Sequence, residues 1–112
     1  MSDEPRLDVA GAAAPPRRNG ELVFAAPWES RLFGMTLALH RAGLFAWDEF
    51  RERLIAEITA WERAHPTRDE WSYYARWLAA LESLLVAKGL CAPAQIDACV
   101  TALAARPPGH DH

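Results

Sequence analysis

The sequence predicts a small all-α protein, a bundle of about four helices arranged as two helical hairpins. Apolar residues recur with the spacing of helix faces, and we find no alternation of the kind that marks strands. Glycine or proline stands at the expected helix boundaries. The chain has 112 residues, which is enough for one such domain and short for two.

The first two helices are expected over residues 27–41 and 47 to about 63. Pro27 suits a first helical turn, because the N–H that proline lacks would have no partner there. Gly43 is a natural left-handed stop for the first helix, and Pro66 follows the second.

The third helix is expected to open with a capping box at residues 67–70 and to run to Lys88, where Gly89 stops it. A fourth helix is expected from Pro93 to about Ala105. These elements define a helical domain, and the segments outside it lack a helical period. The predicted organisation is therefore a flexible N-terminal arm, a helical domain and a flexible His-containing tail, over residues 1–20, 21–105 and 106–112.

Composition excludes several classes of function. The net charge is −3, so the chain lacks the basic surface that phosphate-driven nucleic-acid binding needs. Apolar runs are too short to cross a membrane, and the N-terminus has no secretion signal. Two cysteines do not make a disulfide framework: Cys99 is expected in the core and Cys91 in an exposed turn, which suits a reducing, cytoplasmic setting.

Arg51 falls inside the apolar face of the second expected helix, one turn after Trp47 and one turn before Ile55. It is either a side chain that extends from the edge of the core to water, or an interface arginine that faces an anionic or oxygen-rich partner. An unpaired charge there would be costly, so we expect it to have a partner.

The third expected helix carries two apolar seams. One contains Trp71, Tyr74, Leu78, Leu81 and Leu85, and the other contains Tyr73, Trp77 and Leu84. The helix is either central in the bundle or faces a partner with its second seam. The first helix is similarly two-sided, so we expect the isolated chain to self-associate.

Motifs for catalysis are missing: the sequence has no phosphate loop, no H-E-x-x-H, no Cys-x-x-Cys and no nucleophile elbow. His40 is expected to be a structural histidine and His65 a solvated loop residue. The segment His110, Asp111 and His112 is a candidate metal site, because imidazole and carboxylate groups bind cobalt, nickel or zinc. A solubilising end is the alternative interpretation of this tail.

Three ordered blocks carry a family resemblance. Residues 24–31, FAAPWESR, resemble the F-x-x-P-W-E-x-R motif of nitrile hydratase beta-type chains and their accessory proteins. Residues 43–51 and 73–82 resemble the next two blocks, and Lys88-Gly89-Leu90 closes the match. Nitrile hydratase converts nitriles to amides with cobalt or iron bound in a Cys-rich loop of its alpha subunit.

The resemblance implies a non-catalytic role, because the chain has no such Cys-rich loop and lacks the Gly-rich segment and β-barrel of beta subunits. What remains resembles the accessory protein, or activator. In that family it escorts the alpha subunit, assists cobalt insertion and cysteine oxidation, and yields its place to beta by subunit exchange. No tightly bound cofactor is then expected, only cobalt handled transiently with the alpha subunit.

The resemblance also implies partner-binding residues. Arg51 matches an arginine that contacts oxidised cysteines of the alpha subunit, Tyr73, Tyr74 and Trp77 match a block beside the active site, and Trp28 belongs to the first motif. The stretch between them is longer than in beta chains, so convergence of Arg51 with Tyr73 stays open.

Two alternative interpretations of the function remain. The chain is alternatively the split N-terminal half of a beta subunit of nitrile hydratase or thiocyanate hydrolase, retained in the mature enzyme. It is otherwise an unrelated helical interaction module.

Overall fold

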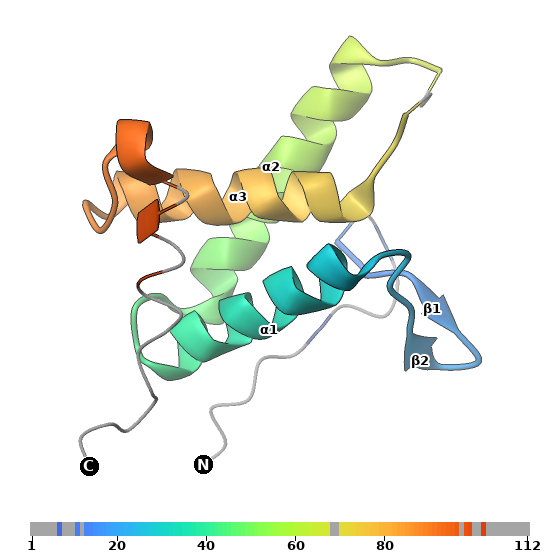
Figure 1. The fold of residues 1–112 in the computed structure, drawn as a ribbon. Helices are drawn as coiled ribbons and strands as arrows, with labels where there is room; N and C mark the ends of the chain where they lie inside the picture. Colours follow the sequence, from blue (N-terminus) through green and yellow to red (C-terminus); the bar gives the residue numbers. More distant parts are fainter. Residues whose placement is uncertain are drawn as a thin grey trace.

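The computed structural model describes residues 7, 11, 13–67, 70–96, 98, 99 and 102. In this part of the chain it contains three α-helices, a short antiparallel strand pair and a 3₁₀ turn, so the predicted helical class holds in broad terms. In chain order the elements are β1 (Arg17–Arg18), β2 (Glu21–Leu22), α1 (Pro27–Arg41), α2 (Trp47–Ala64), α3 (Tyr73–Ala87) and the turn η1 (Pro93–Gln95). Figure 1 shows α3 lying across α2 and alongside α1, with the strand pair next to the start of α1.

The helix ends set by glycine are confirmed. Gly43 after α1 and Gly89 after α3 have φ values of 84° and 75°, the left-handed conformation that glycine adopts without a steric penalty. In each turn the following leucine N–H bonds back to the helix, Leu44 to the carbonyl of Leu39 at 3.2 Å and Leu90 to that of Leu85 at 2.9 Å. Both turns therefore combine a left-handed glycine with a leucine N–H that bonds back to the helix.

The predicted start of the third helix is wrong. The helix begins at Tyr73, and Ser72 caps it by accepting the Ala75 N–H at its Oγ, 3.1 Å away. Glu70, expected in the capping box, has a φ of 64°. A left-handed residue cannot continue a right-handed helix, so the helix forms only beyond it.

A strand pair was not predicted and is present. β1 and β2 pair antiparallel, with Arg18 opposite Glu21, and are joined by Asn19 and Gly20. Both turn residues have positive φ, 54° and 82°, as a two-residue type I′ turn requires. The Asn-Gly pair was the available signal; strands of two residues are too short to show alternation.

The N-terminal arm is not free over residues 13–20. Ala13 is only 6% exposed, Pro15 is buried, and the Tyr73 hydroxyl donates a 2.7 Å hydrogen bond to the Ala13 carbonyl. This segment packs on the aromatic surface of α3. Its own composition gives no indication of that contact.

The expected fourth helix is described only in part. Pro93–Gln95 is a 3₁₀ turn, and Ile96, Ala98, Cys99 and Ala102 are helical; the rest of that prediction, and the tail, lie outside the described residues. The cysteine prediction is wrong: Cys91 and Cys99 form a disulfide, and Cys91 is 6% exposed. The turn after Gly89 folds the chain back, which brings the two Cα atoms to 5.7 Å, within the range that a disulfide spans.

The core is built on α3, whose two apolar seams are both covered by the chain itself. Its buried residues are Tyr73, Tyr74, Trp77, Ala80, Leu81, Leu84 and Leu85. Trp77 reaches α1, where its indole N–H donates to Thr36 Oγ1 at 2.8 Å, and that hydroxyl donates to the Leu32 carbonyl. The central position of α3 explains its second seam, so the self-association predicted from it no longer rests on that feature.

Helices long and apolar enough to span a membrane are not found among the described residues. His40 has the structural role expected of it: its Nδ1 lies 3.1 Å from the Phe45 carbonyl, and its ring packs edge-on against Trp47. His65 ends α2 as an exposed residue, also as expected, and its ring stacks on Trp61.

Candidate partner-binding site

Arg51 is an exposed residue at the rim of a small pit on α2. Trp47, Phe50 and Leu54 of the same helix and Trp77 of α3 form the apolar walls, and Leu7 and Ala13 of the N-terminal segment close the pit. Its volume is about 10 Å³, barely the room that one water molecule needs. Arg51 therefore stands where the apolar face of α2 meets solvent, a position that suits either interpretation of it.

The predicted partner residues on α3 lie in the core instead. Tyr73, Tyr74 and Trp77 are 7%, 2% and 1% exposed. The Trp77 ring centroid lies 4.8 Å from that of Phe50 and 5.4 Å from that of Phe33, distances typical of packed aromatic pairs. As folded, these side chains can reach a partner only if a covering segment moves.

Arg51 and Tyr73 do approach a common element. Ala13 lines the pit together with Arg51 and accepts the Tyr73 hydroxyl at its carbonyl. The N-terminal segment thus lies between the two predicted partner residues and links them. Arg51 and Tyr73, whose convergence the sequence left open, therefore both lie next to this segment.

The Tyr74 hydroxyl is buried and has no hydrogen-bond partner among the described residues. Burial raises the pKa of Tyr74 to about 12, and the carboxylate of Glu29 adds to the rise because it disfavours a second negative charge nearby. The phenol is therefore neutral across the physiological range. Its ring packs on Phe24, 5.5 Å away between centroids.

Trp28 is the one large hydrophobic residue that the described part of the chain leaves exposed, at 41%. It lies in the first turn of α1, the end of that helix next to the strand pair, whereas the other end of α1 leads toward α2 (Figure 1). The predicted partner residues therefore divide into an exposed tryptophan, an exposed arginine and a buried aromatic group.

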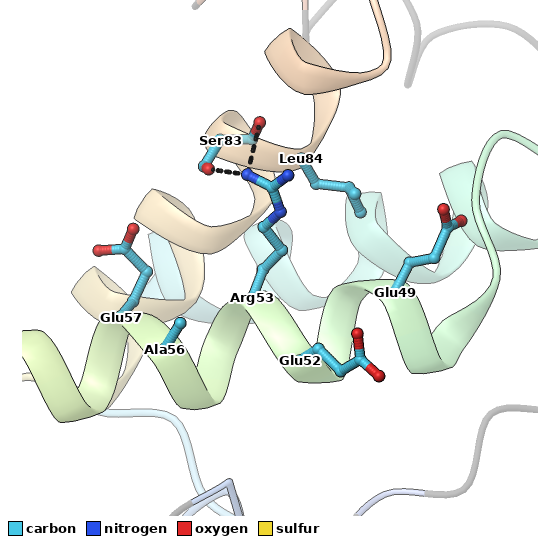
Figure 2. Close-up of a pocket in the computed structure, with 7 residues that line it drawn as sticks. All are labelled: Glu49, Glu52, Arg53, Ala56, Glu57, Ser83 and Leu84. Atoms are coloured by element: carbon cyan, nitrogen blue, oxygen red, sulfur yellow. Dashed lines mark hydrogen bonds between the residues drawn. The ribbon is translucent and has the colours of Figure 1, made fainter.

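Sequence reasoning missed a polar groove between α2 and α3. Figure 2 shows Arg53 crossing from α2 to α3, where its Nη1 donates to the Ser83 hydroxyl at 2.5 Å and approaches the Ser83 carbonyl at 3.4 Å. Glu49, Glu52 and Glu57 stand around it, and the groove has a volume of about 410 Å³. By its helical spacing Arg53 lies outside the apolar face of α2, and only the crossing of the helices pairs it with Ser83.

Glu49 joins the start of α2 to the end of α3. Its Oε1 accepts the Ala46 N–H at 2.9 Å, and the Lys88 ammonium lies 3.1 Å from the same carboxylate. The backbone hydrogen bond first, and then the bond from Lys88, hold the pKa of Glu49 below its usual value. The residue thus caps one helix and pairs with a cation at the end of another.

A family model described as the nitrile hydratase beta subunit, N-terminal, matches residues 8–111. The chain belongs to this family. No curated protein and no solved structure matches it significantly. The match contains every block of the resemblance, and it begins at residue 8, inside the segment that the sequence suggested was a separate arm.

Membership of the nitrile hydratase beta N-terminal family suggests association with nitrile hydratase subunits. It does not distinguish an accessory protein from part of a beta subunit. The predicted metal site at residues 110–112 lies outside the described residues. Within them, no group of three or more His, Cys, Asp or Glu side chains could hold a metal ion.

Proposed function

We propose that the chain is an accessory protein that binds the alpha subunit of a nitrile hydratase, assists cobalt insertion and then yields its place by subunit exchange. The family match over residues 8–111 carries this proposal. In this role the chain has no active site of its own, and cobalt passes through the complex with the alpha subunit.

Arg51 is the residue we propose for the central contact. It is exposed beside an apolar pit, so a partner that covers the pit also desolvates the guanidinium. An arginine in such a place can donate paired, charge-assisted hydrogen bonds to oxygen atoms of oxidised cysteines. Trp28 supplies a second, apolar contact at the far end of α1.

The same family match supports a second candidate, part of a beta subunit that stays in the mature enzyme. The contacts of Arg51 and Trp28 with the alpha subunit would then be permanent. The two candidates differ in the fate of the chain after metal insertion and not in its surface.

Native mass spectrometry of the chain co-produced with alpha and full-length beta subunits tests the proposal. An accessory protein forms a complex with alpha, and the chain is released once cobalt and beta are supplied. A chain that remains in the cobalt-loaded enzyme supports the beta-subunit candidate. A chain that never binds alpha leaves only an unrelated interaction module.

We place this function in the cytoplasm, where newly made alpha subunits would meet the chain. The Cys91–Cys99 disulfide is uncommon in that compartment. Trapping of free thiols at the moment of cell lysis, followed by mass analysis, tests the placement. A fully oxidised pair in the trapped protein would argue for an oxidising compartment.

A further inference from the structure

Residues 13–16, here called the strap, run over the surface where α2 and α3 meet. The Tyr73 hydroxyl holds the strap by its Ala13 carbonyl at 2.7 Å, and Ala13 also lines the pit beside Arg51. Leu7 lies at the same pit. The strap therefore lies between the exposed Arg51 and the buried aromatic residues of α3.

The strap fills its place incompletely. A cavity of about 250 Å³ lies between Ala14 and Pro16 of the strap and Ile58, Trp71 and Tyr73 of the body. Alanine and proline side chains are small, so they make few contacts there. A segment with larger side chains could bury more of this surface than the strap does.

The place that the strap occupies has the chemistry of a peptide-binding seat. Tyr73 presents a hydroxyl donor to a backbone carbonyl, and the buried position of Ala13, beside a pit of only about 10 Å³, has room for a small side chain. Arg51 at the rim suits an anionic group carried next to that side chain. These three features describe an extended segment with a small residue beside an acidic or oxidised one.

We propose that the strap is the chain's own occupant of this seat, and that an extended segment of the partner displaces it on binding. The inference rests on the proposed function, in which the partner is the alpha subunit. Only chains with the strap released can then bind, so the apparent affinity is the intrinsic affinity multiplied by the released fraction.

Three substitutions in the full-length chain test this inference. Ala13→Lys places an ammonium at a position 6% exposed, in the same pit as the Arg51 guanidinium, which disfavours the seated strap, and Tyr73→Phe removes the hydrogen bond that holds it. Ala60→Lys makes the same charge change at an exposed position of α2 and is the matched control. Circular dichroism establishes that each variant keeps its helices.

The affinity of each variant for purified alpha subunit is measured together with amide hydrogen exchange of residues 11–23. We expect Ala13→Lys to bind alpha about 2- to 10-fold more tightly than the wild type, because it weakens the strap and leaves the seat intact. Tyr73→Phe removes the donor from the strap and from the partner segment alike, so its affinity should stay near that of the wild type, while residues 11–23 of the free variant should exchange faster. Ala60→Lys should bind as the wild type does. In the wild-type complex, residues 11–23 should exchange faster than in the free chain.

Unchanged or weaker binding by Ala13→Lys, with residues 11–23 more protected in the complex, would overturn the inference: the strap would then be part of the interface. The proposed function would stand in that case, because alpha is still bound. If neither the wild type nor any variant binds alpha, the proposed function fails and the inference fails with it.

Discussion

Arg51 and Arg53 are two residues apart on α2, yet the fold gives them opposite settings. Arg51 is exposed at the rim of an apolar pit, whereas Arg53 is half-buried and donates to Ser83 on α3. Two positions along a helix turn a side chain by about 200°, so neighbours of one type face different surroundings. Residue type and proximity in sequence therefore say little about which arginine bonds to a neighbouring helix and which lies exposed at the edge of an apolar face.

Arg51→Ala should sharpen this comparison most. We expect the fold to be retained and affinity for the alpha subunit to fall roughly 10- to 100-fold, because charge-assisted hydrogen bonds contribute about 1.5–3 kcal/mol. Cobalt content of the co-produced enzyme should fall with it. Arg63→Ala, at another exposed arginine of α2, is the control. Wild-type cobalt content in the Arg51 variant would reduce Arg51 to a residue at the edge of the core.

Arg53→Ala should show the converse. Removal of the bond to Ser83 leaves polar groups of α3 without this partner, so we expect a loss of about 1 kcal/mol in the free energy of unfolding. Urea unfolding measures it, and binding to alpha should be unaltered. Ser83→Ala should cost less, since the arginine can then turn to solvent. A binding defect without a stability loss would reverse the roles of the two arginines.

The polar face around Arg53 should also respond to acid. Because the pKa of Glu49 is lowered in the fold, its carboxylate stabilises the protein above the unfolded-state pKa of about 4.5. That contribution is lost as pH falls through the lower folded-state value. Glu49→Gln should flatten the stability curve below pH 5, with Glu52→Gln as a charge-matched control on the same helix. Parallel acid profiles for all three proteins would contradict this expectation.

Removal of residues 110–112 should have a smaller effect than Arg51→Ala. Two imidazoles and one carboxylate leave a divalent ion short of a closed coordination shell, so they bind it weakly unless the partner adds ligands. Cobalt incorporation at limiting cobalt, with and without these residues, measures the effect. If incorporation collapses while the complex still forms, the tail is a metal-delivery arm.

The helix ends that a single residue determines could be predicted from the sequence. Pro27, Gly43 and Gly89 act through their own backbone preferences, so α1 begins and ends where expected and both glycine turns form. The start of α3 was missed because the T-x-x-E pattern at 67–70 has a local rival, Ser72, which caps the helix five residues further on.

The features that depend on distant contacts were not accessible in this way. Helical spacing placed Tyr73 and Trp77 on a second apolar seam, more than contact with one core requires. The spacing along a single helix does not show the neighbouring elements, and in the fold α1, α2 and Ala13 cover both residues. The same is true of Cys91 and Cys99, whose pairing needs the turn between them. The position of Arg51 beside the apolar face of α2 could be predicted, because placement on one helix face is a local property, and its role in partner binding stays a prediction.

The hydrogen bond from Trp77 to Thr36 bears on the distance between the two ends of α1, where a partner could make contact. A shift of α1 along α3 by one turn would leave a buried indole N–H without an acceptor, so the two helices have a single register. α1 then acts as a rigid spacer of 15 residues, about 22 Å long. Any partner that touches Trp28 at one end of this spacer and the start of α2 at the other must present two contact points a fixed distance apart, which a folded surface can do and a single short loop cannot.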